Sequence, residues 1–171
     1  MKKLLSVSAL FFVFAFLCST TVMAQGQTVA SPAQTVKGKA AGADVTIAYG
    51  SPAVKGRTVW GELVPYGKVW RAGANDATTF ETSKDIKIEG QTLPAGKYAL
   101  FTIPEQNEWT VIFNKEPKQW GAYSYKADQD ALRVKVKPRK SASFNERLTY
   151  VVNSNGIALQ WADLEVPVAI K

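Results

Sequence analysis

The sequence contains no histidine and only one cysteine, Cys18. The lack of histidine excludes Ser-His-Asp and Cys-His catalytic triads, histidine-ligated metal sites and the most common proton shuttle near neutral pH. A single cysteine cannot form an internal disulfide, and Cys18 lies in the N-terminal segment that we expect to be removed, so the exported chain has no thiolate nucleophile and no thiolate metal site. Most hydrolase and metalloenzyme mechanisms are therefore excluded, and we expect no cofactor and no metal.

The beginning of the chain has the pattern of a secretory signal peptide. Lys2 and Lys3 precede an apolar run from Leu4 to Cys18, and small residues lead up to Ala24. The run is shorter than the roughly 20 residues that cross a bilayer, and no stop-transfer charges follow it. The sequence predicts a signal peptide over residues 1–24, export to the periplasm or the extracellular space, and no transmembrane segment after cleavage.

A competing interpretation makes Cys18 a lipid-attachment site that would tether the exported domain to a membrane. The bulky Phe16 and Leu17 stand where a lipoprotein signal has small residues. We therefore favour simple cleavage after Ala24.

The remaining chain has the size of one domain. Residues 25–34 are small and polar and predict a flexible leader, so we expect the folded domain to span residues 35–171. Short stretches in which apolar and polar residues alternate recur along it, at 45–49, 86–88, 98–103, 132–136, 148–152 and 157–161. No stretch has a helical period. This pattern predicts an all-β fold, a single antiparallel β-sandwich or partly closed barrel of about seven to nine strands.

Two stretches make this prediction more specific. Residues 109–113 are apolar on both faces, which predicts a central strand covered on both sides. The run Asn153-Ser154-Asn155-Gly156 is a strong turn signal, because Asn and Gly adopt positive φ at low cost. We expect the strands on either side of it to form an antiparallel hairpin.

One segment, from Gly50 to Asp76, does not alternate. Loops longer than about fifteen residues are uncommon in compact domains and are usually functional or disordered. This one contains two tryptophans, a tyrosine and several aliphatic residues, enough apolar surface to pack against a sheet. We predict an ordered flap over one end or edge of the sheet, with one helical turn over residues 58–64.

The flap combines aromatic, cationic and polar side chains, and we take eight of them as candidate ligand-binding residues: Arg57, Trp60, Tyr66, Lys68, Trp70, Arg71, Asn75 and Asp76. Aromatic faces stack on the apolar faces of sugars, and guanidinium groups bind oxyanions through two hydrogen bonds. The predicted function is non-catalytic binding of a glycan or a small anion under the flap. In the alternative reading, the arginines only hold the flap in place, through Glu62 or Glu81 or by stacking on tryptophan.

Two other functions compete with ligand binding. A carboxylate-dependent enzyme acting on glycans would use Asp76, Glu81 or Glu62, and requires two carboxylates to converge in one pocket with Arg71. A module that binds another protein of the cell envelope, of unknown identity, requires Trp60 or another flap tryptophan to lie in an exposed apolar patch.

Charge and aromatic residues elsewhere in the chain leave further alternatives. The net charge of +7 falls by two, to +5, when Lys2 and Lys3 leave with the signal peptide. A row of basic residues either follows an anionic polymer or forms a solvated strand face: Arg133, Lys135, Lys137 and Arg139. Three aromatic residues either cover a sheet edge or complete the cleft: Trp120, Tyr123 and Tyr125. Export argues against a nucleic-acid partner.

Several runs together resemble a known family. They are Gly61–Asn75, the preceding Ser51-Pro52 and Lys55-Gly56-Arg57, and the later Leu93–Tyr98 and Trp109–Asn114. In these runs the sequence is similar to the family called domain of unknown function 2911, and the similarity extends from about Ser31 to Ile170. The resemblance implies a small exported bacterial protein of one domain, and it implies no reaction.

Overall fold

The period-two alternation of the sequence becomes an antiparallel β-structure, in a computed structural model that describes residues 30–171. The predicted signal peptide and the first half of the predicted leader, residues 25–29, lie outside the described residues. The strands are β1 (Ala33–Ala40), β2 (Ala43–Gly50), β3 (Thr78–Thr82), β4 (Ile86–Ile88), β5 (Gln91–Leu93), β6 (Gly96–Ile103), β7 (Trp109–Asn114), β8 (Asp130–Val136), β9 (Arg139–Asn153) and β10 (Gly156–Ala169). A single 3₁₀ turn, η1 (Ala127–Gln129), precedes β8. No helix among the described residues is long and apolar enough to cross a membrane.

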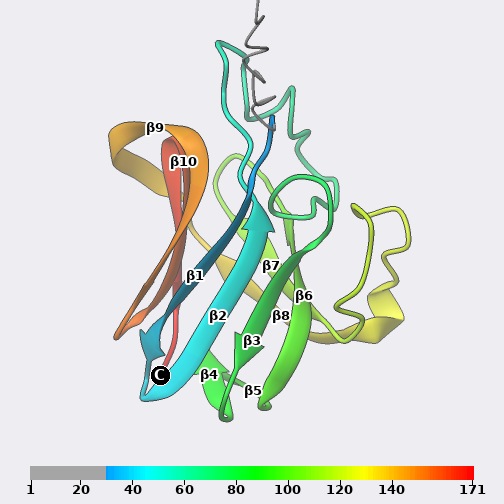
Figure 1. Cartoon of the computed structure of the whole chain (residues 1–171), viewed down its shortest axis with the longest axis vertical. Helices are drawn as coiled ribbons and strands as arrows, with labels where there is room; N and C mark the ends of the chain where they lie inside the picture. Colours follow the sequence, from blue (N-terminus) through cyan, green and yellow to red (C-terminus); the bar gives the residue numbers. More distant parts are fainter. Residues whose placement is uncertain (1–29) are drawn as a thin grey trace, which may run out of the picture.

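Six strands form the main sheet, in the order β1-β2-β3-β6-β7-β8, with every neighbouring pair antiparallel. The long β9–β10 hairpin is a second layer against one face of this sheet, and the short β4–β5 hairpin lies at the end opposite the flap (Figure 1). In the part of the chain that the structure describes, the strands do not close into a barrel. The predicted all-β, sandwich-like fold is confirmed.

The main core lies between the sheet and the β9–β10 hairpin. Val45 and Ile47 of β2 and Phe113 of β7 point into it from the sheet, and Leu148 of β9 and Trp161 of β10 meet them from the hairpin. All five are almost completely buried. The alternation in the sequence therefore marks the faces that bury apolar surface, which is the main stabilising contribution to the fold.

The prediction of a central strand at residues 109–113 is confirmed. β7 lies between β6 and β8. Its Phe113 faces the main core, and its Ile112 belongs to a second apolar cluster on the outer face of the sheet. Phe101 lies in the same outer cluster, and Tyr125 packs against it with ring centroids 5.1 Å apart.

The predicted hairpin around residues 153–156 is also confirmed, although its strands are much longer than expected. β9 has 15 residues and β10 has 14, and two register shifts between Gln160 and Leu164 interrupt the alternation that would have revealed their length. The three-residue strand β5 was not expected, because turn residues surround it. Together with β5, the described strands exceed the predicted seven to nine by one.

The flap connects β2 to β3 at the upper end of the molecule in Figure 1. Val54, Val59, Val64 and Ala72 of the flap are buried in the main core, so the prediction of an ordered flap is confirmed. The helical turn expected over residues 58–64 is wrong. Backbone bonds there run over five residues, from the Val64 N–H to the Val59 carbonyl at 2.8 Å, and they form an irregular turn.

Candidate functional site

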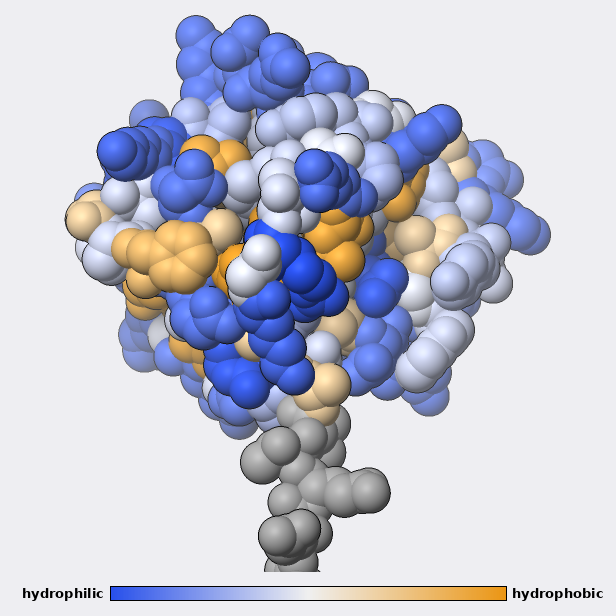
Figure 2. All heavy atoms as spheres, turned by 90° about the horizontal axis from the view of Figure 1, so that it is seen from above, coloured by the Kyte–Doolittle hydropathy of each residue, from blue (hydrophilic) through white to orange (hydrophobic). Residues whose placement is uncertain are grey.

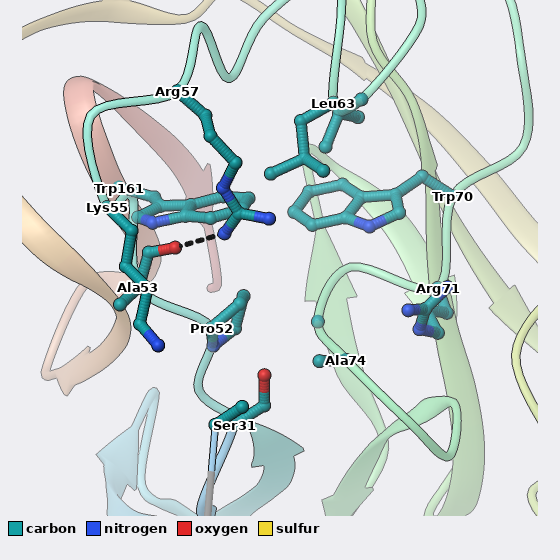
Figure 3. Close-up of a pocket in the computed structure, with 13 residues that line it drawn as sticks. Ser31, Pro52, Ala53, Lys55, Arg57, Leu63, Trp70, Arg71, Ala74 and Trp161 are labelled. Atoms are coloured by element: carbon teal, nitrogen blue, oxygen red, sulfur yellow. Dashed lines mark hydrogen bonds between the residues drawn. The ribbon is translucent and has the colours of Figure 1, made fainter.

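A pocket of about 400 Å³ opens where the flap meets the β9–β10 layer. Trp70 of the flap and Trp161 of β10 form its aromatic wall, and Lys55, Arg57 and Arg71 supply its charges. Figure 3 shows Arg57 reaching from the flap toward the gap between the two tryptophans, while Arg71 approaches from the loop on the Trp70 side. The pocket is thus built from segments about a hundred residues apart in the chain.

Two further tryptophans, Trp60 and Trp109, support the aromatic wall from behind. The rings of Trp70 and Trp161 are nearly parallel, at 18°, with centroids 5.9 Å apart. Trp60 packs edge-on against Trp161 at 5.7 Å and against Trp109 of β7 at 4.9 Å. Trp109 and Trp161 are almost completely buried, so the wall rests on the rigid core of the molecule and not on the flap alone.

The three cations of the pocket have no acidic counterpart in it. Among the described residues, no carboxylate lines the pocket and none forms an ion pair with Lys55, Arg57 or Arg71. The Arg57 guanidinium donates to the carbonyls of Val54, at 2.9 Å, and Ala53, at 2.5 Å (Figure 3). These bonds fix the side chain without neutralising it, and the pocket keeps a positive potential.

Arg71 is the more unusual of the two arginines. Its Nε is buried and has no hydrogen-bond partner among the described residues. An unsatisfied buried donor costs about 1–3 kcal/mol, more for a charged group. Since this nitrogen has almost no exposed surface, a ligand in the open pocket would meet the other nitrogens of the guanidinium.

The backbone that follows Arg71 is held in an unusual conformation. Ala72 has φ of 52°, in the left-handed region that residues with a Cβ rarely adopt. Its carbonyl accepts hydrogen bonds from the hydroxyls of Thr78, at 2.9 Å, and Tyr150, at 2.8 Å. Burial raises the pKa of Tyr150, so its phenol remains a donor. These two bonds fix the direction in which the Arg71 side chain leaves the loop.

The structure brings three of the eight predicted site residues together in this pocket, namely Arg57, Trp70 and Arg71. Trp60 lies behind the wall and does not line the pocket. Tyr66 faces a separate shallow hollow on the loop between β6 and β7, beside Glu105.

The other three predicted residues lie apart from the pocket. Lys68 is exposed on the flap and does not line it. The Asn75 side chain donates to the carbonyl of Ser31 at 3.3 Å, and it shares another hollow, beside β1 and β2, with Asp76. The eight candidate residues are close together in the sequence, but the turns of the flap separate their side chains in space.

Sequence reasoning missed the other lining residues, and three of these supply a charge or a large apolar side chain: Lys55, Leu63 and Trp161. Lys55 and Leu63 lie within the flap, and only the orientation of its turns shows that they face the pocket. In the sequence, Trp161 has the pattern of an ordinary core-facing residue of a strand. No local pattern indicates that this strand passes beneath the flap.

The carboxylates proposed for an enzyme do not converge. Asp76, Glu81 and Glu62 are absent from the lining of the pocket that contains Arg71. Glu81 lies on β3 near Lys97, at 4.0 Å, and pairs with neither flap arginine. Residues 30–171 also contain no group of three or more His, Cys, Asp or Glu that could hold a metal ion. This pocket therefore lacks the pair of acids that a glycoside-cleaving mechanism requires.

The row of basic residues does not form a continuous ladder. β8 ends at Val136, before Lys137 and Arg139. Arg133 pairs with Asp130 at 2.6 Å, Lys135 lies 3.3 Å from Glu108, and Arg139 pairs with Glu165. Local ion pairs thus reduce the positive field that an anionic polymer would follow.

The second aromatic group consists of three residues, and none of them lines the pocket: Trp120, Tyr123 and Tyr125. Tyr125 covers the outer apolar cluster of the sheet. Trp120 and Tyr123 are exposed, by 63% and 86%. Trp60 and Trp70, in contrast, are half-buried against the core. The flap therefore does not form the exposed tryptophan patch that the protein-interface hypothesis requires.

Comparison with known proteins identifies the family of this chain. Searches among curated proteins and among solved structures each found no match. Residues 31–170 match the family described as "Protein of unknown function (DUF2911)". The matched stretch runs from just before β1 to the last residues after β10 and contains all of the lining residues except Ala30. Since it covers most of the chain, the protein belongs to the DUF2911 family.

Proposed function

We propose that this protein is an exported binding protein whose pocket takes a small anionic ligand. The ligand binds under the flap, at the face that Arg57 and Arg71 line. The observation that carries the proposal is a pocket lined by three cations and, among the described residues, by no carboxylate. The N-terminal pattern of the sequence supports export.

The arrangement suits an oxyanion for electrostatic and geometric reasons. A guanidinium group presents a planar fork of donors that matches a carboxylate, sulfate or phosphate. The Arg57 guanidinium is already fixed by the carbonyls of Ala53 and Val54, and the backbone next to Arg71 is held through the carbonyl of Ala72. Little ordering of side chains remains to oppose binding.

The test is a thermal-shift and calorimetric titration of the purified exported form with acetate, sulfate, phosphate and glucuronate at constant ionic strength. A saturating anion at a hundred times its Kd stabilises the folded state by about 2.7 kcal/mol. We expect Arg71→Gln and Arg57→Gln each to weaken binding at least tenfold. Lys87→Gln is the matched control, since it removes one charge from β4 at the opposite end of the molecule. The proposal is refuted if no anion binds, or if both arginine variants bind as the wild type does.

A further inference from the structure

The shape and chemistry of the pocket narrow the class of its ligand. Resting on the proposed function, we infer that the ligand is a ring-bearing organic carboxylate, whose carboxylate meets one of the two guanidinium groups while its flat apolar ring lies against Trp70 and Leu63. Three features of the pocket lead to this class: its size, its apolar wall and its lack of acceptors.

The pocket is too large for an inorganic anion alone. An apolar cavity of about 150 Å³ is enough to hold a benzene ring. At about 400 Å³, this pocket has room for a ring with a charged substituent, and it falls within the usual range of small-molecule sites. A lone sulfate or phosphate would leave most of the apolar wall in contact with water.

The wall between the two arginines is apolar. Trp70 contributes an indole supported by the tryptophan cluster, and Leu63 projects from the flap with 40% of its surface exposed. The view from above shows patches of apolar surface between hydrophilic side chains (Figure 2). A ring against Trp70 and Leu63 would remove apolar surface of these side chains from water, at about 25 cal/mol per Å².

The pocket offers few acceptors for the hydroxyl groups of a sugar. Among its described lining residues there is no Asp, Glu, Asn or Gln, and the only side-chain hydroxyl is that of Ser31. Sites that bind sugars must satisfy several hydroxyl donors, because an unpaired buried donor is costly. A neutral glycan is therefore a poor match, although an aromatic wall alone would suit one.

Calorimetry with a matched set of small molecules tests the inference. The ring carboxylates are phenylacetate, indole-3-acetate and cyclohexanecarboxylate. Phenylacetamide keeps the ring and lacks the charge, acetate keeps the charge and lacks the ring, and methyl glucoside represents a neutral sugar. We expect at least one ring carboxylate to bind ten times more tightly than phenylacetamide, acetate and the sugar.

Each result separates the inference from the proposed function. If acetate or sulfate binds as tightly as every ring carboxylate, the ring is irrelevant and the inference fails, while anion binding stands. If phenylacetamide binds as tightly as phenylacetate, both fail, because the charge is irrelevant. If no ring carboxylate binds, or the sugar binds more tightly, the inference is overturned, and the response to acetate and sulfate decides the proposed function.

Two variants locate the ring. Leu63→Ala changes an exposed side chain, so it leaves the fold intact. We expect it to weaken binding of the ring carboxylate at least threefold and to leave binding of acetate unchanged. Trp70→Leu should have the larger effect of the same kind, with circular dichroism to verify folding. Lys87→Gln again serves as the control. Equal losses for acetate and the ring carboxylate in Leu63→Ala would contradict the proposed placement.

Discussion

Tyr150 links the core to the pocket through a single hydroxyl. Its ring is buried between the two layers, and its hydroxyl donates to the carbonyl of Ala72 at 2.8 Å. Ala72 immediately follows Arg71 and has a backbone conformation that needs external support. The orientation of the candidate ligand-binding arginine therefore depends on a residue that does not line the pocket.

We predict that Tyr150→Phe weakens anion binding more than its modest effect on folding suggests. Loss of one hydrogen bond lowers the free energy of unfolding by about 0.5–1.5 kcal/mol, and it loosens the backbone that aims Arg71. Urea denaturation and calorimetry measure the two effects. Tyr98→Phe is the matched control, because its hydroxyl donates to the Pro94 carbonyl at 2.9 Å, away from the pocket. Equal loss of affinity in the two variants would refute the role of Tyr150.

Tyr125 gives a prediction about pH. Its hydroxyl donates to Asp130 at 2.7 Å and accepts from Arg133. Burial, followed by the hydrogen bond to the Asp130 carboxylate, raises the pKa of Tyr125 to about 12. The fold thus favours the neutral phenol, whose contribution is complete below the unfolded pKa near 10 and is lost as the pH rises toward 12.

The corresponding experiment compares wild type with Tyr125→Phe. The difference in their free energies of unfolding should be constant below pH 10 and should shrink between pH 10 and about 12. A spectrophotometric titration of the phenolate should lose one late step in the variant. Tyr123→Phe, at a side chain that is 86% exposed, should leave the pH dependence of stability and the late step of the titration unchanged. A difference that does not vary with pH would rule out this role of Tyr125.

At the scale of elements, the two ends of the flap are joined by a close backbone contact. The Ala74 N–H donates to the Gly50 carbonyl at 3.2 Å, and a Cβ on Gly50 would meet the Ala74 carbonyl oxygen at 2.2 Å. Only glycine allows this approach. The contact closes the flap into a loop and places Arg71 and Trp70 opposite the hairpin.

We predict that Gly50→Ala separates the two ends of the flap. The clash is with backbone, which cannot rotate away, so the free energy of unfolding should fall by about 1–3 kcal/mol, as in other overpacked sites. Urea denaturation measures this loss. Affinity for anions should fall as well, since the pocket walls move. Unchanged stability would show that the base of the flap is more adaptable than the contact suggests.

For the whole molecule, the pocket is a place where three cations gather without ion-pair partners among the described residues. Arg133, Lys135 and Arg139 all have acidic partners, whereas the three cations of the pocket have none among the described residues. The net charge of the chain, +7 over its full length, adds a weaker attraction for anions from all sides.

We therefore predict that anion binding weakens as salt increases. Charges separated by more than the Debye length, about 10 Å at 0.1 M salt, are screened, so the affinity should fall several-fold between 0.02 and 0.5 M sodium chloride. Calorimetry at a series of salt concentrations measures the slope. Arg71→Gln should flatten it more than the remote Lys87→Gln does. An affinity independent of salt would contradict a charge-based site.

The sequence predicts the fold better than it predicts the site, for a physical reason. Strand faces follow from alternation, which is local, so β2, β6, β7 and the β9–β10 hairpin were foreseeable. β5 was hidden by turn residues, and the register shifts in β10 concealed its length. The pocket depends instead on which way each turn of the flap faces and on Trp161, which lies about ninety residues further along the chain. Non-local packing of this kind leaves no local pattern.

The tryptophan cluster also makes the protein an optical reporter of its own pocket. Of the five tryptophans, Trp60, Trp70, Trp109 and Trp161 are in mutual contact, and Trp120 lies apart, 63% exposed. Neighbouring indoles couple their electronic transitions, so the cluster should dominate the near-ultraviolet circular dichroism and emit at shorter wavelength than Trp120. Trp120→Phe would remove the solvent-exposed emission. The remaining fluorescence would come from the four clustered indoles. Its intensity would change when a ligand occupies the pocket, without any attached label.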